Sequence, residues 1–207
     1  MSVLTFEQFL RAAAAEGEAI NTLFEERLFD LVGVLHKIAQ VLSDEGVPYE
    51  LIGGLAVLVH VEEADPEHTT LTRDVDLMIR RDDLERIKEA AANHGFRFRH
   101  TAGVDMLLYG ETNSARNAVH LIFAGEKVRP NQAAPNPPLA PVTKHIHGGE
   151  VMVIPVVDLV RMKLSAYRLK DQVHIKSMDA ARLITPEVEA ALPEELKTRL
   201  QHVRETE

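Results

Sequence analysis

Residues 49–79 read YELIGGLAVLVHVEEADPEHTTLTRDVDLMI, and this stretch decides the fold class. A short apolar run ends in Gly53-Gly54, and the apolar residues that follow are interpreted as a helix. The segment 73–79 then alternates between polar and apolar residues, as a half-buried strand does. The stretch therefore predicts a strand–turn–helix–strand unit.

Two acidic residues of this unit are candidate metal ligands. Asp74 and Asp76 are two residues apart on the predicted strand, so their side chains point to the same face. Two neighbouring carboxylates repel each other unless a cation lies between them. Mg²⁺ uses one or two carboxylates together with substrate phosphates. We predict a site for Mg²⁺, with Mn²⁺ as an alternative; a solvated strand face is the other interpretation.

The two glycines are candidates for binding phosphate. Gly53 and Gly54 lie at a strand-to-helix junction, where the backbone can approach a phosphate closely. The N-terminus of the following helix offers free N–H groups and the positive end of the helix dipole. With Arg73, which directly precedes the aspartates, they are predicted to bind the nucleotide.

The rest of the chain divides into elements by hydrophobic periodicity and by Gly and Pro stops. The predicted helices cover 4–16, 23–45, 83–94 and 157–181, and a last helix opens at 185–187. The predicted strands cover 49–52, 73–79, 96–100, 105–109, 118–123 and 151–154. The segment 129–149 is rich in proline and is expected to be a long surface loop without regular structure.

This order of elements predicts an α/β (α+β) protein with a mixed sheet. We expect N-terminal helices in 1–46, the core with the sheet in 47–155, and a helical C-terminal part in 156–207 that packs on the core.

The composition limits the class of protein. Of 207 residues, 45% are hydrophobic and 27% are charged, which is typical of soluble globular proteins. The net charge of −9 argues against a broad surface for duplex DNA. The absence of cysteine excludes disulfides and thiol catalysis. No apolar stretch approaches the roughly 20 residues that span a bilayer, and the N-terminus has no secretory signal. We therefore expect a cytoplasmic protein without a membrane partner.

The motifs IGGLA (52–56) and LTRDVDL (71–77) together resemble the signature of the polymerase-beta-like nucleotidyltransferase superfamily. Within it, they are most similar to the AbiEii-type toxin nucleotidyltransferases and their uncharacterised relatives. The segment 158–171 is similar to the downstream helix of that family, and the resemblance covers roughly 30–182. It implies a nucleotidyltransferase core and Mg²⁺-dependent transfer of a nucleoside monophosphate from an NTP to an acceptor hydroxyl. A toxin role, with a cognate antitoxin as partner, is implied by the resemblance alone.

The predicted helix over 157–181 carries further candidates. Its packed stripe is expected to consist of Leu159, Met162, Ala166, Leu169 and Val173. If the helix is unbroken, a row of polar residues lies beside that stripe: Lys163, Tyr167, Lys170 and His174. We predict that Lys163 and Lys170 offset the charge of the phosphates as pyrophosphate leaves. The alternative is a pair of lysines at a core boundary, salt-bridged by Asp171 or another acid.

One residue departs from the pattern that the resemblance implies. The family carries a third carboxylate on a neighbouring strand, but the matching segment, 117–123, has His120 at that position. A histidine can act as a base or bind the acceptor, but it is a poor ligand for Mg²⁺. Asp105 and Glu126 are candidate substitutes for the acid. A buried core histidine is the other interpretation of His120.

The leading hypothesis is a Mg²⁺-dependent nucleotidyltransferase whose acceptor is tRNA or another RNA, a protein or a small alcohol. Its catalytic residues would be Asp74, Asp76, Lys163 and His120. The second hypothesis is a catalytically weakened relative that binds a nucleotide or a partner without turnover, which His120 favours. The third is a structural subunit, because the apolar stripes of the N-terminal helices permit a homodimer.

Overall fold

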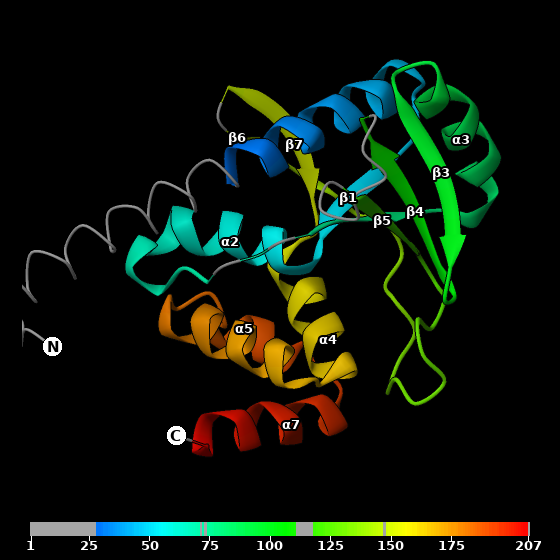
Figure 1. Ribbon diagram of the computed structural model, residues 1–207. Coiled ribbons are helices and arrows are strands. Elements are labelled where there is room, and N and C mark those ends of the chain that lie inside the picture. Colours follow the sequence, from blue (N-terminus) through cyan, green and yellow to red (C-terminus); the bar gives the residue numbers. More distant parts are fainter. Residues whose placement is uncertain (1–27, 71, 73, 111–117, 147, 207) are drawn as a thin grey trace, which may run out of the picture.

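A computed structural model describes residues 28–70, 72, 74–110, 118–146 and 148–206. Within these residues, seven strands form one mixed sheet, and helices lie on both sides of it (Figure 1). The fold class predicted from the sequence is therefore confirmed. The predicted helix over 4–16 lies outside the described residues.

The sheet has the strand order β3-β4-β5-β2-β1-β7-β6. Its strands are β1 (Tyr49–Ile52), β2 (Val75–Ile79), β3 (Phe96–Thr101), β4 (Val104–Tyr109), β5 (Ala118–Phe123), β6 (Val142–Ile146) and β7 (Gly149–Val153). β2 lies at the centre, antiparallel to β1 and parallel to β5. The strand that carries Asp76 therefore has a neighbour on each side, and both contribute to the site.

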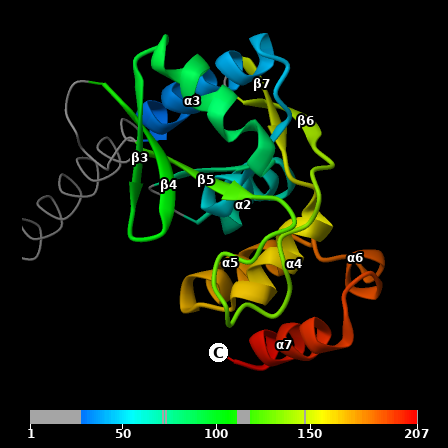
Figure 2. The same ribbon diagram turned by 90° about the vertical axis from the view of Figure 1, so that its right-hand side faces the viewer.

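Two groups of helices cover the sheet. The described helices are 28–44, α2 (Gly53–Ala64), α3 (Leu84–Ala92), α4 (Val156–Ala166), α5 (Leu169–Ala180), α6 (Pro186–Ala190) and α7 (Glu194–Glu205). Helix 28–44 and α3 lie on the upper side of the sheet in Figure 1, and α2, α4, α5 and α7 on its lower side; the turned view in Figure 2 again shows α4, α5 and α7 below the strands. None of the helices described is long and apolar enough to cross a membrane.

The core between these layers is aliphatic. Leu35, Ile38 and Leu42 of helix 28–44 are fully buried and recur at helical spacing. On β2, Leu77 and Ile79 are also fully buried, and alternation along the strand points them away from the face of Asp76. Each such side chain contributes about 1.5–3 kcal/mol when it leaves water. This packing holds β2 in place from the face opposite the site.

The prediction for 129–149 was wrong in its second part. That part contains β6, which pairs antiparallel with β7. The first part is irregular, but buried polar contacts fix it: Asn136 Nδ2 donates to the Phe123 carbonyl (2.9 Å), and the Ala140 N–H donates to the Glu50 carboxylate. Proline is concentrated before Val142, so the pairing of β6 with the strand that follows is not interrupted.

The single helix predicted over 157–181 was also wrong. The Tyr167 N–H still bonds to the Lys163 carbonyl, but Tyr167 adopts a left-handed conformation (φ +51°) that ends α4. A new helix, α5, begins after Arg168. Leu169 and Val173, which were predicted on the packed stripe, are 82% and 53% exposed, because the break turns them toward solvent.

Candidate active site

A cavity of about 600 Å³ opens between the sheet and the corner that joins α4 to α5. The cavity is lined by most of the residues that the sequence singled out: Gly53, Asp74, Asp76, His120, Lys163 and Lys170. Gly54 lies behind its wall in the first turn of α2, and Arg73 lies outside the described residues. The fold thus brings candidates from four separate segments of the chain into one cavity.

We call Gly53, Asp74, Asp76 and His120 the strand half of the site. Asp76 of β2 lies between Ile52 of β1 and His120 of β5 in the register of the sheet. Directly paired residues point to the same face, and His120 Nδ1 lies 2.9 Å from Asp76 Oδ1. Asp74 was predicted to lie on this strand, but it directly precedes β2. It still lines the same cavity.

Gly53 makes room for the second oxygen of Asp76. A Cβ at this position would lie 2.8 Å from Asp76 Cγ and would overlap Oδ2. The backbone of Gly53 also has φ +74°, a conformation that residues other than glycine rarely adopt. Asp76 therefore has one oxygen on His120 and the other against the glycine turn.

The N-terminus of α2 is a candidate site for an anion. The helix begins at Gly53, its N-cap is Ile52, and no side chain caps it. The first N–H groups of a helix have no partner within the helix. At Gly54, a Cβ would lie 2.6 Å from Thr72 Oγ1, so the next segment also passes close to this turn. Gly53 lines the cavity, so the start of α2, the end of a helix that favours anions, lies at the cavity wall.

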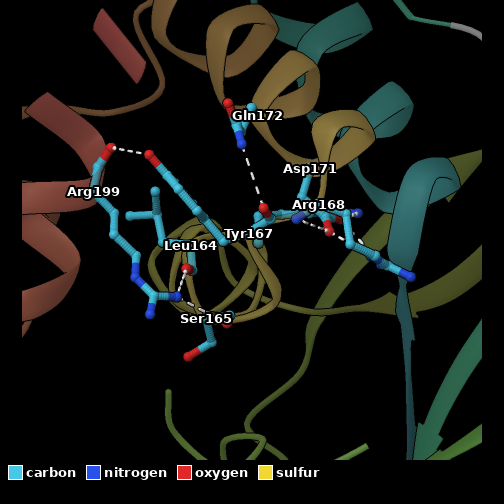
Figure 3. A network of polar contacts seen from close by, with 8 residues as sticks. Leu164, Ser165, Tyr167, Arg168, Asp171, Gln172 and Arg199 are labelled. Atoms are coloured by element: carbon cyan, nitrogen blue, oxygen red, sulfur yellow. Dashed lines mark hydrogen bonds and ion pairs between the residues drawn. The ribbon is translucent and has the colours of Figure 1, made fainter. Parts of the chain in front are cut away.

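We call Lys163, Arg168 and Asp171 the helical half of the site. The side chain of Asp171 is 1% exposed, and its carboxylate forms ion pairs with both cations: Lys163 Nζ at 3.4 Å and Arg168 Nε at 2.6 Å. Figure 3 shows Arg168 folded back onto Asp171 at the start of α5. The side chain of Asp171 also accepts from the Arg168 N–H and so caps α5.

Burial and charge act against each other on these groups. Burial lowers the pKa of Lys163, although Asp171 and Asp76 favour its charged form. For Asp171, burial raises the pKa, but the hydrogen bond from Arg168 and the charge of Lys163 outweigh it, and the net shift is downward. The sequence alternative of a lysine salt-bridged by Asp171 is therefore present, but Lys163 still lines the cavity.

The helix α7 fixes the corner that carries this half (Figure 3). Arg199 donates to the carbonyls of Leu164 (2.9 Å) and Ser165 (3.1 Å), in the last turn of α4. Its guanidinium carbon lies 5.1 Å from the centre of the Tyr167 ring. Carbonyls that have no partner within α4, because the helix ends, are thus bound from a third helix.

The row of four polar residues predicted on one helix does not form. Lys163 and Lys170 line the cavity from the two sides of the break, whereas Tyr167 does not line it and instead donates to the Arg199 carbonyl. His174 is buried next to Gly54, behind the cavity wall. Burial, reinforced by the charge of Lys163, lowers the pKa of His174 to about 4.

Neither candidate substitute for the third acid lies at the site. Asp105 is on β4, but it alternates with Met106 and points to the opposite face, where it contacts His100 Nδ1 (2.5 Å). Glu126 forms an ion pair with Arg81 beyond the end of β5. Among the residues that the structure describes, His120 therefore stands alone at the position of the expected acid.

The contact with Asp76 defines the chemistry of His120. Its hydrogen bond with Asp76 raises the pKa of His120, and burial opposes this shift. Because Nδ1 faces Asp76, Nε2 remains for another partner. This arrangement matches the way in which a carboxylate orients a histidine for general base catalysis.

Several lining residues were not found by sequence reasoning. Met106 of β4 is the cross-strand partner of His120, Ile122 of β5 lies two residues beyond it, and Arg129 comes from the irregular loop. Alternation along β5 is enough to place Ile122 on the face of His120. The positions of Met106 and Arg129 depend on strand pairing and on the path of the loop, and nothing local in the sequence indicates them.

The donor set at Asp74 and Asp76 fits one hard divalent cation. No group of three or more His, Cys, Asp or Glu side chains arranged to hold a metal occurs in the part of the chain that is described. Two carboxylates suffice for Mg²⁺ when phosphate oxygens and water complete its shell. His120 is a poor ligand for this kind of cation, and its Nδ1 is engaged by Asp76.

Solved structures share this fold. ANT(2'')-Ia in complex with adenylyl-2''-tobramycin matches with a TM-score of 0.52 and 14% identity, over 84% of this chain and 96% of that one. An antigenic nucleotidyltransferase-like protein from Paracoccidioides brasiliensis matches at 0.54 and 19%, over 84% and 87%. The Megavirus polyadenylate synthase matches at 0.54 and 11%, over 89% of this chain and 39% of that one. No family model matches the sequence, and no curated protein does. The chain therefore has the nucleotidyltransferase fold.

Proposed function

We propose that this protein is a metal-dependent nucleotidyltransferase that moves a nucleoside monophosphate from an NTP to an acceptor hydroxyl. One observation carries the proposal: a single cavity contains the Gly53 turn, the aspartates 74 and 76, and the cations of the helical half. The turn and the cations suit a triphosphate, and the carboxylates suit the cation that accompanies it. A solvated strand face would not explain why these groups converge.

In the proposed reaction, the acceptor oxygen bonds to the α-phosphorus, and the bond from that phosphorus to the bridging oxygen of the β-phosphate breaks. His120 Nε2 takes the proton of the acceptor hydroxyl, while Asp76 holds the ring through Nδ1. The leaving pyrophosphate remains near Lys163, Arg168 and Lys170, whose positive charges offset its negative charge. A bound divalent cation at Asp74 and Asp76 supplies further neutralisation of the phosphates.

The test is transfer of label from each α-³²P-NTP, with Mg²⁺ or Mn²⁺, to pools of RNA, proteins and small alcohols, including tobramycin, since ANT(2'')-Ia was solved with an adenylylated form of it. We expect transfer that EDTA abolishes and that Asp74→Ala and Asp76→Ala reduce at least about 10²-fold. Asp82→Ala, which changes an exposed acid outside the cavity, should leave transfer unchanged. Equal transfer by the variants at 74 and 76 and by wild type would falsify the proposal.

A second candidate function is nucleotide binding without turnover. The observation that favours it is His120 in place of a third carboxylate. Calorimetric titration with a nonhydrolysable NTP and Mg²⁺ separates the two functions. Binding that needs Asp76, in a protein that transfers no label to any pool, would identify a binding module instead of an enzyme.

The resemblance to AbiEii-type toxins extends the proposal to a toxin with a cognate antitoxin. In that case, induced expression should arrest growth of the host, and Asp76→Ala should relieve the arrest at equal protein level. Arrest by both forms would separate toxicity from the proposed chemistry.

A further inference from the structure

The cavity has a second end that the proposed reaction has not used. We call Val104, Met106, Ile122 and Val128 the acceptor shelf. Met106 pairs with His120 across β4 and β5, and Ile122 lies two residues further along β5, so both extend the sheet face that starts at Asp76. All four shelf residues line the cavity. The apolar shelf thus begins next to the imidazole that would take the acceptor proton.

The charges of the cavity are distributed unevenly. Its acids are Asp74, Asp76 and Asp171, and all three belong to the metal and nucleotide end. Of these, Asp171 is buried and already paired with two cations. Within the described residues, the shelf contributes no carboxylate, and of the charged residues that line the cavity the closest to it in sequence is Arg129, next to Val128.

An acceptor with several ammonium groups does not fit this end. Each ammonium that loses water needs a carboxylate or a comparable acceptor, and a cavity with four Lys or Arg against three Asp adds repulsion. An acceptor without cationic groups loses nothing by the absence of carboxylates and gains from contact with the apolar shelf.

Resting on the proposed function, we propose that the acceptor is a hydroxyl compound without ammonium groups, whose flat apolar face lies on the acceptor shelf with its reacting hydroxyl at His120. The shelf selects the acceptor by contact area and by the lack of any anion for a cationic substrate. Selection of this kind rejects wrong acceptors through groups that they would leave unpaired.

The experiment uses the full chain with Mg²⁺ and a nonhydrolysable NTP. Nucleotide binding is measured first by calorimetry, and its failure would contradict the proposed function itself. Phenyl β-glucoside, a neutral hydroxyl compound with an aromatic face, and tobramycin, a polycation, are then titrated into the complex. We expect phenyl β-glucoside to bind the wild type at least tenfold more tightly than tobramycin does.

A matched pair of variants locates the effect. Val128→Asp places an acid on the shelf, and Val142→Asp places one on β6, outside this cavity; both valines are exposed, at 54% and 38%. Val128→Asp should weaken the binding of phenyl β-glucoside about tenfold and strengthen the binding of tobramycin. Val142→Asp should change neither. Tobramycin binding the wild type as tightly as the glucoside, no saturable binding of the glucoside to the nucleotide complex, or equal effects of the two variants would overturn the inference.

Discussion

The strand half and the helical half of the site differ in how their acidic side chains are paired. In the helical half, Asp171 of α5 is paired with Lys163 of α4 and with Arg168, which lies between the two helices. In the strand half, no Lys or Arg among the described residues forms an ion pair with Asp74 or Asp76; Asp76 contacts His120, and its side chain stays 25% exposed. The acid of the helical half is therefore already paired within the protein, whereas the carboxylates of the strand half are the ones that the proposed function assigns to a divalent cation.

The largest expected effect comes from breaking the helical half at its centre. Asp171→Ala leaves a buried lysine without its anion, so we expect the free energy of unfolding in urea to fall by about 3–5 kcal/mol. Asp179→Ala is the control, because it removes one partner of a more exposed ion pair with Arg204. That change should cost at most about 1 kcal/mol. Equal losses of unfolding free energy in the two variants would show that Asp171 is not needed to balance the charge of a buried lysine.

A buried acid on the strand side sharpens the contrast. Glu50 of β1 is 0% exposed, and no cation contacts it among the described residues. Burial is the main reason that its pKa is raised to about 7. The folded protein therefore binds this proton more tightly than the unfolded chain, and the stabilisation, complete below about pH 4.5, is lost as the pH rises through about 7.

Glu50→Gln removes this titration. Relative to wild type, the variant should gain about 3 kcal/mol of unfolding free energy between pH 4.5 and pH 8. Urea unfolding of both proteins at the two pH values measures the difference, in which the titration of all other groups cancels. A difference that does not change with pH would contradict the raised pKa of Glu50.

The geometry of the strand half can be broken without changing any charge. Gly53→Ala would push a methyl group into Asp76, so we expect nucleotide transfer to fall about 10²-fold. Gly46→Ala is the matched control, since Gly46 also has a positive φ (+61°) but has open space around it. The control should lose stability of about 1 kcal/mol and no activity. Similar activity losses in both would mean that backbone strain, and not the contact with Asp76, is responsible.

The smallest expected effect concerns the support of the helical half. Arg199→Ala removes the donors to Leu164 and Ser165, and we expect about 2 kcal/mol lower stability in thermal or urea unfolding. Arg161→Ala, a change in a surface ion pair with Asp158, should cost less than about 1 kcal/mol. Metal-dependent nucleotide binding should change little in either variant, because Asp76 and Gly53 stay in place. A loss of binding in Arg199→Ala alone would mean that the two halves are coupled.

Those parts of the site that depend on neighbouring residues could be predicted from the sequence. The turn at Gly53, the alternation that places Asp76 opposite the core, and the helix after the turn depend on residues close together in the chain, where side-chain period and backbone preference act directly. The same reasoning failed at Tyr167. The left-handed residue there is not a glycine, and the bonds from Arg199 that satisfy the end of α4 come from more than thirty residues away.

What the sequence by itself determined is thus the strand–turn–helix–strand unit with its aspartates, and the mixed α/β class. The tertiary structure alone decided that His120 bonds to Asp76 while Asp105 turns away, that Lys163 is paired with Asp171, and that an apolar shelf continues the site. The physical reason is register: a strand position acquires its neighbours only when another strand, here 44 residues further on, pairs with it, and a shift of one residue would turn His120 to the opposite face.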